Sequence, residues 1–390
     1  MVRHWPVIEP VRGMRPPWIL LALIVITLPL PGVADKTANS PGQKIWALRI
    51  NDLLVEPPGW TAASHHEIQD IAFSPDNNRL ALTIQHVQQV SERNFLWNTH
   101  LLILDTQSPR TNVRQFDLSG TCGVDLSWNQ SGDTLLVCGT LVRLADGSTR
   151  VVSPSPLPSV SRHYSVNKAF WLDAEHVVRP SGTILDVACR EVGCWPVPAQ
   201  WRIGAVTVQK GWVFMWHSEG QFPKVVSEVA IVDRDSHLPL SGWPHRKLTF
   251  VANMTFAVGA GMFCSTIAEA QQLTKPRLHC WAVNGGTETE LPGELTRYSL
   301  GGSAISSFRV VAEKWKHDRF EWLGESPALP RVRAVVDLHS GKVITSWEPR
   351  IQNSNSPTVQ DWPYHCALSS TGEFIAEAGD GSMEFYHVAP

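Results

Sequence analysis

A chain of 390 residues can form one large β domain or two ordinary domains, because all-β folds often exceed the usual domain size. Its 43% hydrophobic and 18% charged residues, with 27 Gly, 28 Pro and 17 Trp, indicate globular material rich in strands and turns and exclude overall disorder. The net charge is only -3, and basic and acidic side chains are interspersed, so nucleic acid is not expected as a partner.

The first predicted element is a secretory leader. Three arginines up to Arg15 precede an apolar run from Trp18 to Leu30, and PGVADK follows it. The run is shorter than the roughly 20 residues of a membrane-spanning helix, and the order of segments is typical of a signal peptide cleaved after Ala34. The alternative is an uncleaved anchor, which would be the one attachment to a membrane. We therefore expect a leader at 1–34, a linker at 35–43, one domain at 44–390, and a secreted or periplasmic location.

Beyond the leader, one pattern recurs: a short apolar strand ends at Asp or a substitute, a tight turn follows, and another strand begins. Clear copies are LLILDTQSP, GTILDVACR, VAIVDRDSH and AVVDLHSGKVI. The marked positions are Asp105, Asp146, Asp186, Asp233, Asn284, Asp337 and His387. These seven positions lie 40 to 53 residues apart. Seven units of that length predict a β-propeller with about four strands per blade.

Each marked strand is preceded by two strands joined by a polar turn. In IAFSPDNNRLALTI, Pro75 presets the backbone of the turn and Asp76 can bond its own main chain. Counterparts are LSWNQSGDTLLV, KAFWLDAEHVV, VTVQKGWVFMW and ALSSTGEFIAEA. Each blade is thus expected to open with a hairpin.

These stretches, FSPDNNRLA with LLILDT and also VVDLHSGKVI, resemble the blades of WD-repeat and TolB-type β-propellers. The resemblance runs from Lys44 to Pro390 and implies the fold alone. No Trp-Asp dipeptide ends the marked strands and no Gly-His precedes the blades, so the partners of WD-repeat proteins do not transfer.

The two ends of the predicted ring indicate how it closes. The last unit reaches FYHV without an outer strand, and KIWALRI, from Lys44 to Ile50, is a spare strand. Pairing the two would remove open sheet edges. The expected fold class is all-β: a seven-bladed β-propeller with four-stranded antiparallel blades, closed by the N-terminal strand joining the C-terminal blade.

Cysteine spacing gives three candidate disulfides on neighbouring strands: Cys122 with Cys138, Cys189 with Cys194, and Cys264 with Cys280. Cys366 is expected to be a buried free thiol. Neither CxxC pairs nor an HExxH motif occur, so we expect no metal and no cofactor.

Motifs for hydrolysis are also missing from the sequence. There is no GxSxG elbow, and LGGSAIS around Ser303 lacks the second Gly. Asp233 and Asp235 fit a hairpin turn better than a calcium loop.

Four tryptophans are expected just before the first strand of a blade, where packing between blades is the favoured role: Trp60, Trp201, Trp243 and Trp362.

Loop length breaks the repeat. The connection between the second and third strands is short in blades two, three and seven and long in blades one, four, five and six, and such connections share one face of a propeller. Binding residues concentrate on such loops, and aromatic and Arg side chains dominate hot spots. The candidate binding residues are Arg93, Phe95, Trp97, His217, Phe222, Trp315, Lys316, His317, Arg319, Phe320 and Trp322. Alternatively, these loops only cover one another.

The favoured function is an exported, non-catalytic propeller that binds a protein, peptide or carbohydrate on this face. One alternative is a glycan hydrolase or lyase using loop carboxylates, for which the candidates are Glu313, Asp318, Glu321 and Glu325. Another is a propeller that assists a separate hydrolase of the prolyl-oligopeptidase kind.

Overall fold

The computed structural model describes most of the chain beyond its N-terminal segment. The described residues are 40–55, 65–91, 94–118, 126–152, 169–219, 226–243, 246–249, 251–267, 277–289, 291, 299–306, 308–315, 330–348, 365–379 and 382–388. Contacts divide the chain into Met1–Lys36 and Thr37–Pro390, and every described residue belongs to the second unit. Within the described residues, no helix is long and apolar enough to cross a membrane.

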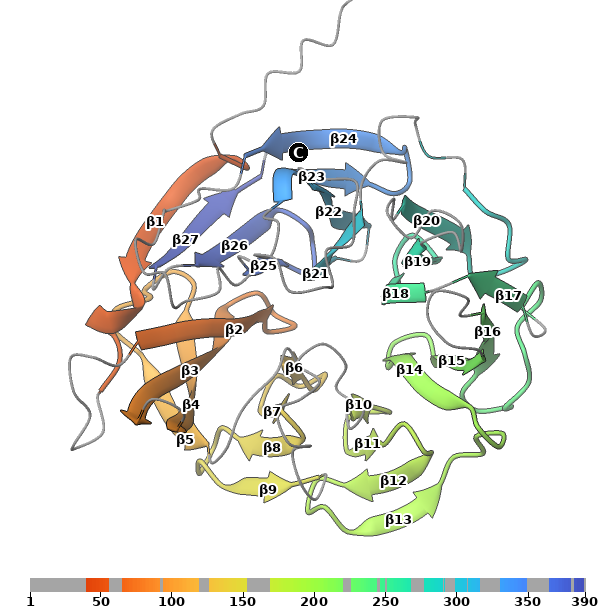
Figure 1. The fold of residues 1–390 in the computed structure, drawn as a ribbon, viewed down its shortest axis with the longest axis horizontal. Helices are drawn as coiled ribbons and strands as arrows, with labels where there is room; N and C mark the ends of the chain where they lie inside the picture. Colours follow the sequence, from red (N-terminus) through yellow and green to blue (C-terminus); the bar gives the residue numbers. More distant parts are fainter. Residues whose placement is uncertain are drawn as a thin grey trace, which may run out of the picture. The chain divides into compact units, whose positions relative to one another are not determined.

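The unit is a ring of seven antiparallel sheets, as the repeat predicted (Figure 1). Blades one to three are β2 (His65–Phe73), β3 (Arg79–Ser91), β4 (Asn94–Asp105) and β5 (Arg114–Leu118); β6 (Leu126–Trp128), β7 (Thr134–Val137), β8 (Thr140–Arg143) and β9 (Thr149–Val151); and β10 (Phe170–Trp171), β11 (His176–Val178), β12 (Thr183–Asp186) and β13 (Glu191–Cys194). In each blade the first strand is innermost, as Figure 1 shows.

The remaining blades follow the same order from the centre of the ring outwards (Figure 1). Blade four is β14 (Arg202–Thr207), β15 (Trp212–Glu219), β16 (Val226–Asp233) and β17 (Arg246–Thr249), and blade five is β18 (Val251–Ala257), β19 (Met262–Ile267) and β20 (Arg277–Ala282). Blade six is β21 (Ser299–Ile305), β22 (Arg309–Trp315), β23 (Pro330–Asp337) and β24 (Lys342–Trp347), and blade seven is β25 (His365–Leu368), β26 (Phe374–Gly379), β27 (Ser382–His387) and β1 (Gln43–Arg49). In blade five, a bridge between Trp281 and Glu288 marks the outer edge.

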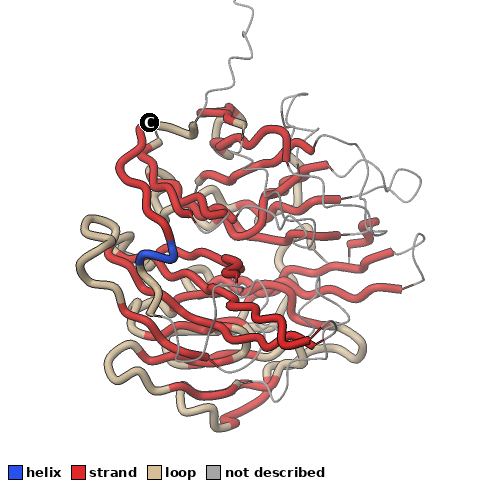
Figure 2. The backbone as a smooth tube through the Cα atoms, turned by 60° about the vertical axis from the view of Figure 1, so that its left-hand side comes forward, coloured by secondary structure: helices blue, strands red, loops and turns tan. Residues whose placement is uncertain are grey.

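The predicted closure is confirmed. Strand β1 pairs antiparallel with β27, with Trp46 opposite Phe385 and Leu48 opposite Met383. The rings of Trp46 and Phe385 stack with centroids 4.8 Å apart. A short 3-10 helix, η1 (Ile50–Asp52), follows β1 and is the blue segment of Figure 2.

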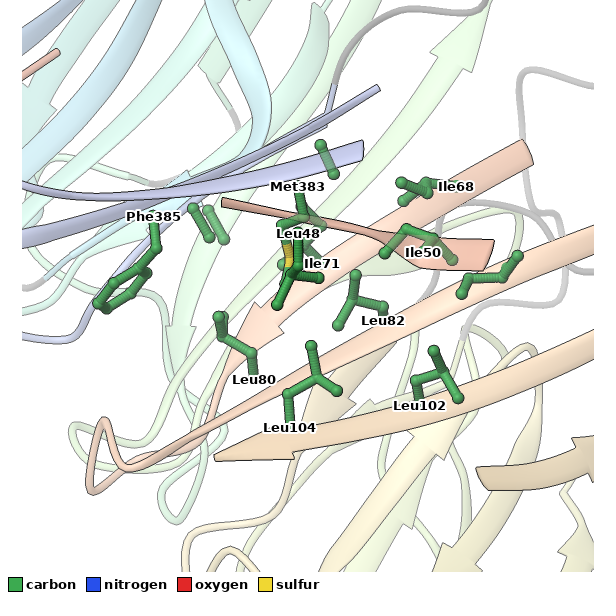
Figure 3. Close-up of a cluster of buried hydrophobic side chains, with 14 residues drawn as sticks. Leu48, Ile50, Ile68, Ile71, Leu80, Leu82, Leu102, Leu104, Met383 and Phe385 are labelled. Carbon is green, nitrogen blue, oxygen red and sulfur yellow. The ribbon is translucent and has the colours of Figure 1, made fainter. Parts of the chain in front are cut away.

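The hydrophobic core is divided among the blade interfaces. At the seam between blades seven and one, Leu48 and Ile50 pack with Ile71 and Leu82 of blade one and with Phe385 of blade seven (Figure 3). The strand that closes the ring therefore also contributes apolar side chains to the next interface. Burial of large aliphatic side chains stabilises by about 1.5–3 kcal/mol each.

The repeated Asp has a structural explanation. Asp105, Asp186, Asp233 and Asp337 each end the third strand of a blade, where a side-chain oxygen accepts hydrogen bonds from main-chain N–H groups of the following turn. Backbone hydrogen bonds lower the pKa of Asp186 and of Asp233 below the ordinary value. Asp233 thus caps a turn, as predicted, and this role accounts for the repeat.

Two expectations about element boundaries are wrong. The long loop expected in blade one is instead a hairpin, in which Trp97 pairs with Val87. The segment is rich in residue types that favour strands, and these extend β3 and β4. Trp243 precedes β17, the outer strand of blade four, rather than the first strand of blade five. It is nonetheless fully buried against Phe263 and Trp281, in the packing role that was expected.

The cysteines divide into bonded and free thiols. Cys264 and Cys280 lie opposite each other on β19 and β20 and form a disulfide. Cys138 is also disulfide-bonded, and its predicted partner, Cys122, lies outside the described residues. Cys189 and Cys194 are free, because Cys189 lies in the turn before β13 and Cys194 ends that same strand, so the two are not cross-strand neighbours. Cys366 is buried and free, as expected.

Candidate functional site

An open cavity lies at one end of blade four. We define the long-loop face as the end of the ring at which second strands end and third strands begin, as at Glu219 and Val226 of blade four. The cavity is at this face, where β14 begins and β15 approaches its last residue. It has a volume of about 430 Å³, and its lining residues are Gln200, Trp201, Arg202, Trp216, His217 and Ser218.

A bulge in β14 shapes this cavity. Arg202 pairs with Trp216, and the register shifts between Ile203 and Ala205, which leaves Gly204 as the extra residue. A Cβ atom at Gly204 would lie 2.8 Å from Cδ1 of Trp216. A glycine at this position therefore lets the Trp216 ring lie close against the strand.

His217 is oriented by a hydrogen bond to the main chain. Its Nδ1 lies 3.1 Å from the carbonyl oxygen of Gln200, so Nδ1 carries a proton and donates to that oxygen. Its Nε2 lies 3.3 Å from Oε1 of Glu219, and this contact is a hydrogen bond only when both ring nitrogens carry a proton. The imidazole and the ring of Trp201 lie 6.3 Å apart between centroids, so the main chain and an aromatic neighbour both restrict the histidine.

Arg202 gives the cavity a positive charge. Its side chain is exposed, and it makes no ion pair within the part of the chain that the structure describes. None of the six lining residues is acidic. An exposed guanidinium beside two tryptophans is suited to a carboxylate or to an aromatic group.

A second cavity, of about 390 Å³, lies between blades three and four. It is mostly apolar, and its lining residues are Trp195, Pro196, Val197, Pro198, Trp201, Met215, Ala230, Val232, His237 and Pro239. Trp195 is fixed there because its Nε1 donates to the carbonyl oxygen of Arg234 at 3.1 Å and its ring meets His237 edge-on. Trp201 lines both cavities.

A buried ionic cluster lies at the same end of the ring, between blades six and seven. Arg333 is completely buried, and its Nε lies 3.0 Å from Oε1 of Glu313 while its Nη1 lies 2.9 Å from Oε1 of Glu377. The indole Nε1 of Trp347 donates to the same oxygen of Glu377 at 2.9 Å. Arg333 on β23 thus joins blade six to β26 of blade seven.

The strand β25 adds two titratable groups beside this cluster. Burial, with the charge of Arg333 as a smaller cause, lowers the pKa of His365 to about 4. Burial raises the pKa of the Cys366 thiol to about 12. Both groups are therefore neutral at pH 7, and the cluster is ordered by its ion pairs.

The structure places few of the predicted binding residues in a described environment. His217 lies in the first cavity. Phe95 and Trp97 lie on strand β4 rather than in a loop, and Trp315 is the last residue of β22, with no side chain described for these three. The other predicted binding residues lie outside the described residues: Arg93, Phe222, Lys316, His317, Arg319, Phe320 and Trp322.

The acids considered for glycan chemistry divide in the same way. Glu313 is buried and paired with Arg333, so it is not placed as a loop carboxylate. Asp318, Glu321 and Glu325 lie outside the described residues. Among the described residues, no group of three or more His, Cys, Asp or Glu side chains could hold a metal ion.

Sequence reasoning missed Arg202 and Trp216 and favoured packing between blades as the role of Trp201. The available signal was local: Trp201 and Arg202 adjoin the start of an inner strand, and Gly204 interrupts that strand. An isolated Gly in a strand indicates a bulge or a close approach of another group.

No protein-family model matches the chain, and no curated protein matches it. Among solved structures, it is similar to a chain in the crystal structure of the mitotic checkpoint complex, with TM-score 0.50, 11% identity, and coverage of 90% of this chain and 96% of that one. It is also similar to the hydrazine synthase of Kuenenia stuttgartiensis, with TM-score 0.51, 10% identity, and coverage of 86% and 99%. BamB from Moraxella catarrhalis matches with TM-score 0.46, 13% identity, and coverage of 89% and 99%. At these identities the likeness shows the propeller fold alone.

Proposed function

We propose that this chain is an exported, non-catalytic β-propeller that binds a protein or peptide partner on the long-loop face. The observation that carries the proposal is the open cavity at blade four, lined by Trp201, Arg202, Trp216 and His217. Tryptophan and arginine are the residue types that supply most binding energy at protein interfaces, above all in pockets. Trp216 and His217 lie on β15, where the close approach of Gly204 and a hydrogen bond to Gln200 fix their rings, which lowers the entropy cost of binding.

Site-specific photo-crosslinking tests the proposal. A photoreactive amino acid replaces Gln200, which is exposed at the cavity, and a matched variant carries it at Gln130, in the turn between β6 and β7 at the opposite end of the ring. Irradiation of cells that express the protein should give one discrete protein adduct from position 200 and none from position 130. Absence of an adduct at 200, or the same adducts at both positions, would contradict the proposal.

Export is supported by the order of charged, apolar and small residues in the leader and by the Cys264–Cys280 disulfide, since disulfides persist in oxidising compartments. Sequencing the N-terminus of the mature protein tests it. A start at Asp35 is the expected result. An intact N-terminus in a cytosolic fraction would contradict export.

A further inference from the structure

The two cavities at blade four adjoin each other at Trp201. The first is open and carries the charged and hydrogen-bonding groups, whereas the second is lined mainly by tryptophan, proline and aliphatic side chains. Each volume lies near the lower end of the roughly 300–1,000 Å³ range of ligand pockets. Sites of this size suit one or two side chains of an extended ligand.

The apolar cavity is suited to a large hydrophobic side chain. Trp195, Met215 and Val232 are buried in the core that blades three and four share, so the cavity wall is fixed by packing. Pro196, Pro198 and Pro239 restrict the backbone around it. Such a cavity binds an apolar side chain by removing its surface from water, and little conformational entropy is lost because the cavity wall is already fixed.

The open cavity is suited to a carboxylate. Arg202 is exposed with no ion pair in the described part of the chain, and a guanidinium can bind a carboxylate through two parallel hydrogen bonds. The two histidines that line the cavities, His217 and His237, add no negative charge, and no lining residue of either cavity is acidic. Two acids lie near His217: Glu219, whose Oε1 is 3.3 Å from Nε2 of the histidine, and Glu228, which pairs with His217 across β15 and β16.

We propose that the two cavities are adjacent subsites of one peptide groove, which binds a carboxylate at Arg202 next to a large apolar side chain beyond Trp201. The proposal rests on the proposed function and specifies its ligand class. Neighbouring side chains of an extended peptide alternate in direction at about 3.3 Å per residue, so an acidic and an apolar residue close together in one peptide can face the two subsites on either side of Trp201. The carboxylate is that of an Asp or Glu side chain or of a peptide C-terminus.

Selection from random heptapeptide libraries tests the proposal on the purified mature protein. One library displays peptides with free C-termini and the other displays internal sequences, which separates a terminal carboxylate from a side-chain carboxylate. The expected result is enrichment of a carboxylate within two residues of Phe, Leu, Ile, Met or Trp. Synthetic copies of the enriched peptides, labelled with fluorescein, then give dissociation constants by fluorescence anisotropy.

Three variants assign the site. Arg202→Gln should weaken binding about tenfold by removing the charge-assisted hydrogen bonds. Trp201→Ala should weaken binding of the same peptides by a similar factor, while Arg150→Gln, an equal charge change at an exposed position of β9, should leave it unchanged. Circular dichroism in the near ultraviolet confirms that each variant remains folded.

Several results would overturn the proposal: no enriched peptide, enrichment of basic peptides, equal binding by wild type and Arg202→Gln, or binding to an immobilised glycan array instead. Each of these leaves a photo-adduct at position 200 possible, because a folded partner can use the face without this groove. Absence of the adduct with retained peptide binding would instead contradict a protein partner at this face in cells while sparing the groove.

Discussion

Two arginines at the same end of the ring illustrate opposite uses of one side chain. Arg333, between blades six and seven, is completely buried and held by Glu313 and Glu377. Arg202, at blade four, is exposed and has no ion pair within the described residues. A buried charge must be paired because its desolvation is expensive, whereas an exposed charge can remain available to a ligand.

The comparison extends to the surroundings of the two arginines. The seam from blade six to blade one contains the ring closure and the buried ion cluster, so changes there should act on folding. At blade four, a glycine bulge and a carbonyl hold the aromatic groups around an open cavity, so changes there should act on binding. Stability and binding measurements on paired variants can test whether the two regions differ in this way.

Deletion of β1, residues 43–49, should have the largest effect. It removes the outer strand of blade seven and the side chains of Trp46 and Leu48 from the seam, and it opens a sheet edge. We expect a large fall in the melting temperature measured by circular dichroism, or failure to fold. An unchanged melting temperature would rule out the closure described above.

Point variants keep this test informative if the deletion does not fold. Leu48→Ala should lower the free energy of unfolding by about 2–4 kcal/mol, because Leu48 is buried against Met383. Ile45→Ala is the matched control, since Ile45 is 48% exposed on the same strand. Equal effects of the two substitutions in urea titrations would contradict the packing of β1.

Arg333→Met should lower the free energy of unfolding by about 3–5 kcal/mol, because it removes the guanidinium that pairs with the buried Glu313 and the partly buried Glu377. Adding Glu377→Gln should recover part of the loss by removing one of those charges. Urea titration of the single and double variants gives both values. A loss below about 1 kcal/mol for Arg333→Met would show that the cluster does not hold blades six and seven together.

His365 should make this seam sensitive to acid. Its pKa in the folded protein is lowered to about 4, below its unfolded value of about 6.5, so the unfolded chain binds more protons between these values. The stability that neutral His365 contributes is fully present above pH 6.5. The free energy of unfolding should fall, by up to about 1.4 kcal/mol per pH unit, as the pH drops towards 4. Urea titrations across this window should show a shallower slope for His365→Gln. The matched control, His339→Gln at an exposed turn, should retain the wild-type slope.

The fold could be predicted from the sequence because each blade repeats one physical solution. The Asp that ends a third strand caps the next turn wherever it occurs, and the spare strand at Lys44 could pair with only one open edge. The boundaries that were wrong depended on pairing partners. Whether residues 87 and 97 lie in a loop or a hairpin is decided between two segments, so neither segment alone reveals it.

The site was less predictable, because it is made by relative position rather than by a motif. His217 was predicted as the first residue of the long connection in blade four, whereas it lies on strand β15 and pairs with Glu228. Trp216 becomes a wall of the cavity only through the bulge at Gly204. The place of Arg202 beside Trp201, at the start of an inner strand, does not by itself indicate that its side chain lines a cavity. The disulfide pairs show the same limit. Cys264 and Cys280 were correctly predicted to lie opposite each other on neighbouring strands, whereas Cys189 precedes β13 and Cys194 ends that same strand, so both are free.

The smallest expected effect on stability belongs to Arg202→Gln. The side chain is exposed and has no ion pair in the described part of the chain, so the free energy of unfolding should stay within about 0.5 kcal/mol of wild type. Urea titration beside Arg333→Met compares the two arginines directly. A loss of 3 kcal/mol or more at Arg202, in the range of about 3–5 kcal/mol for a broken buried pair, would mean that this arginine also holds the ring together. Substitutions at blade four would then act on folding, as those between blades six and seven do.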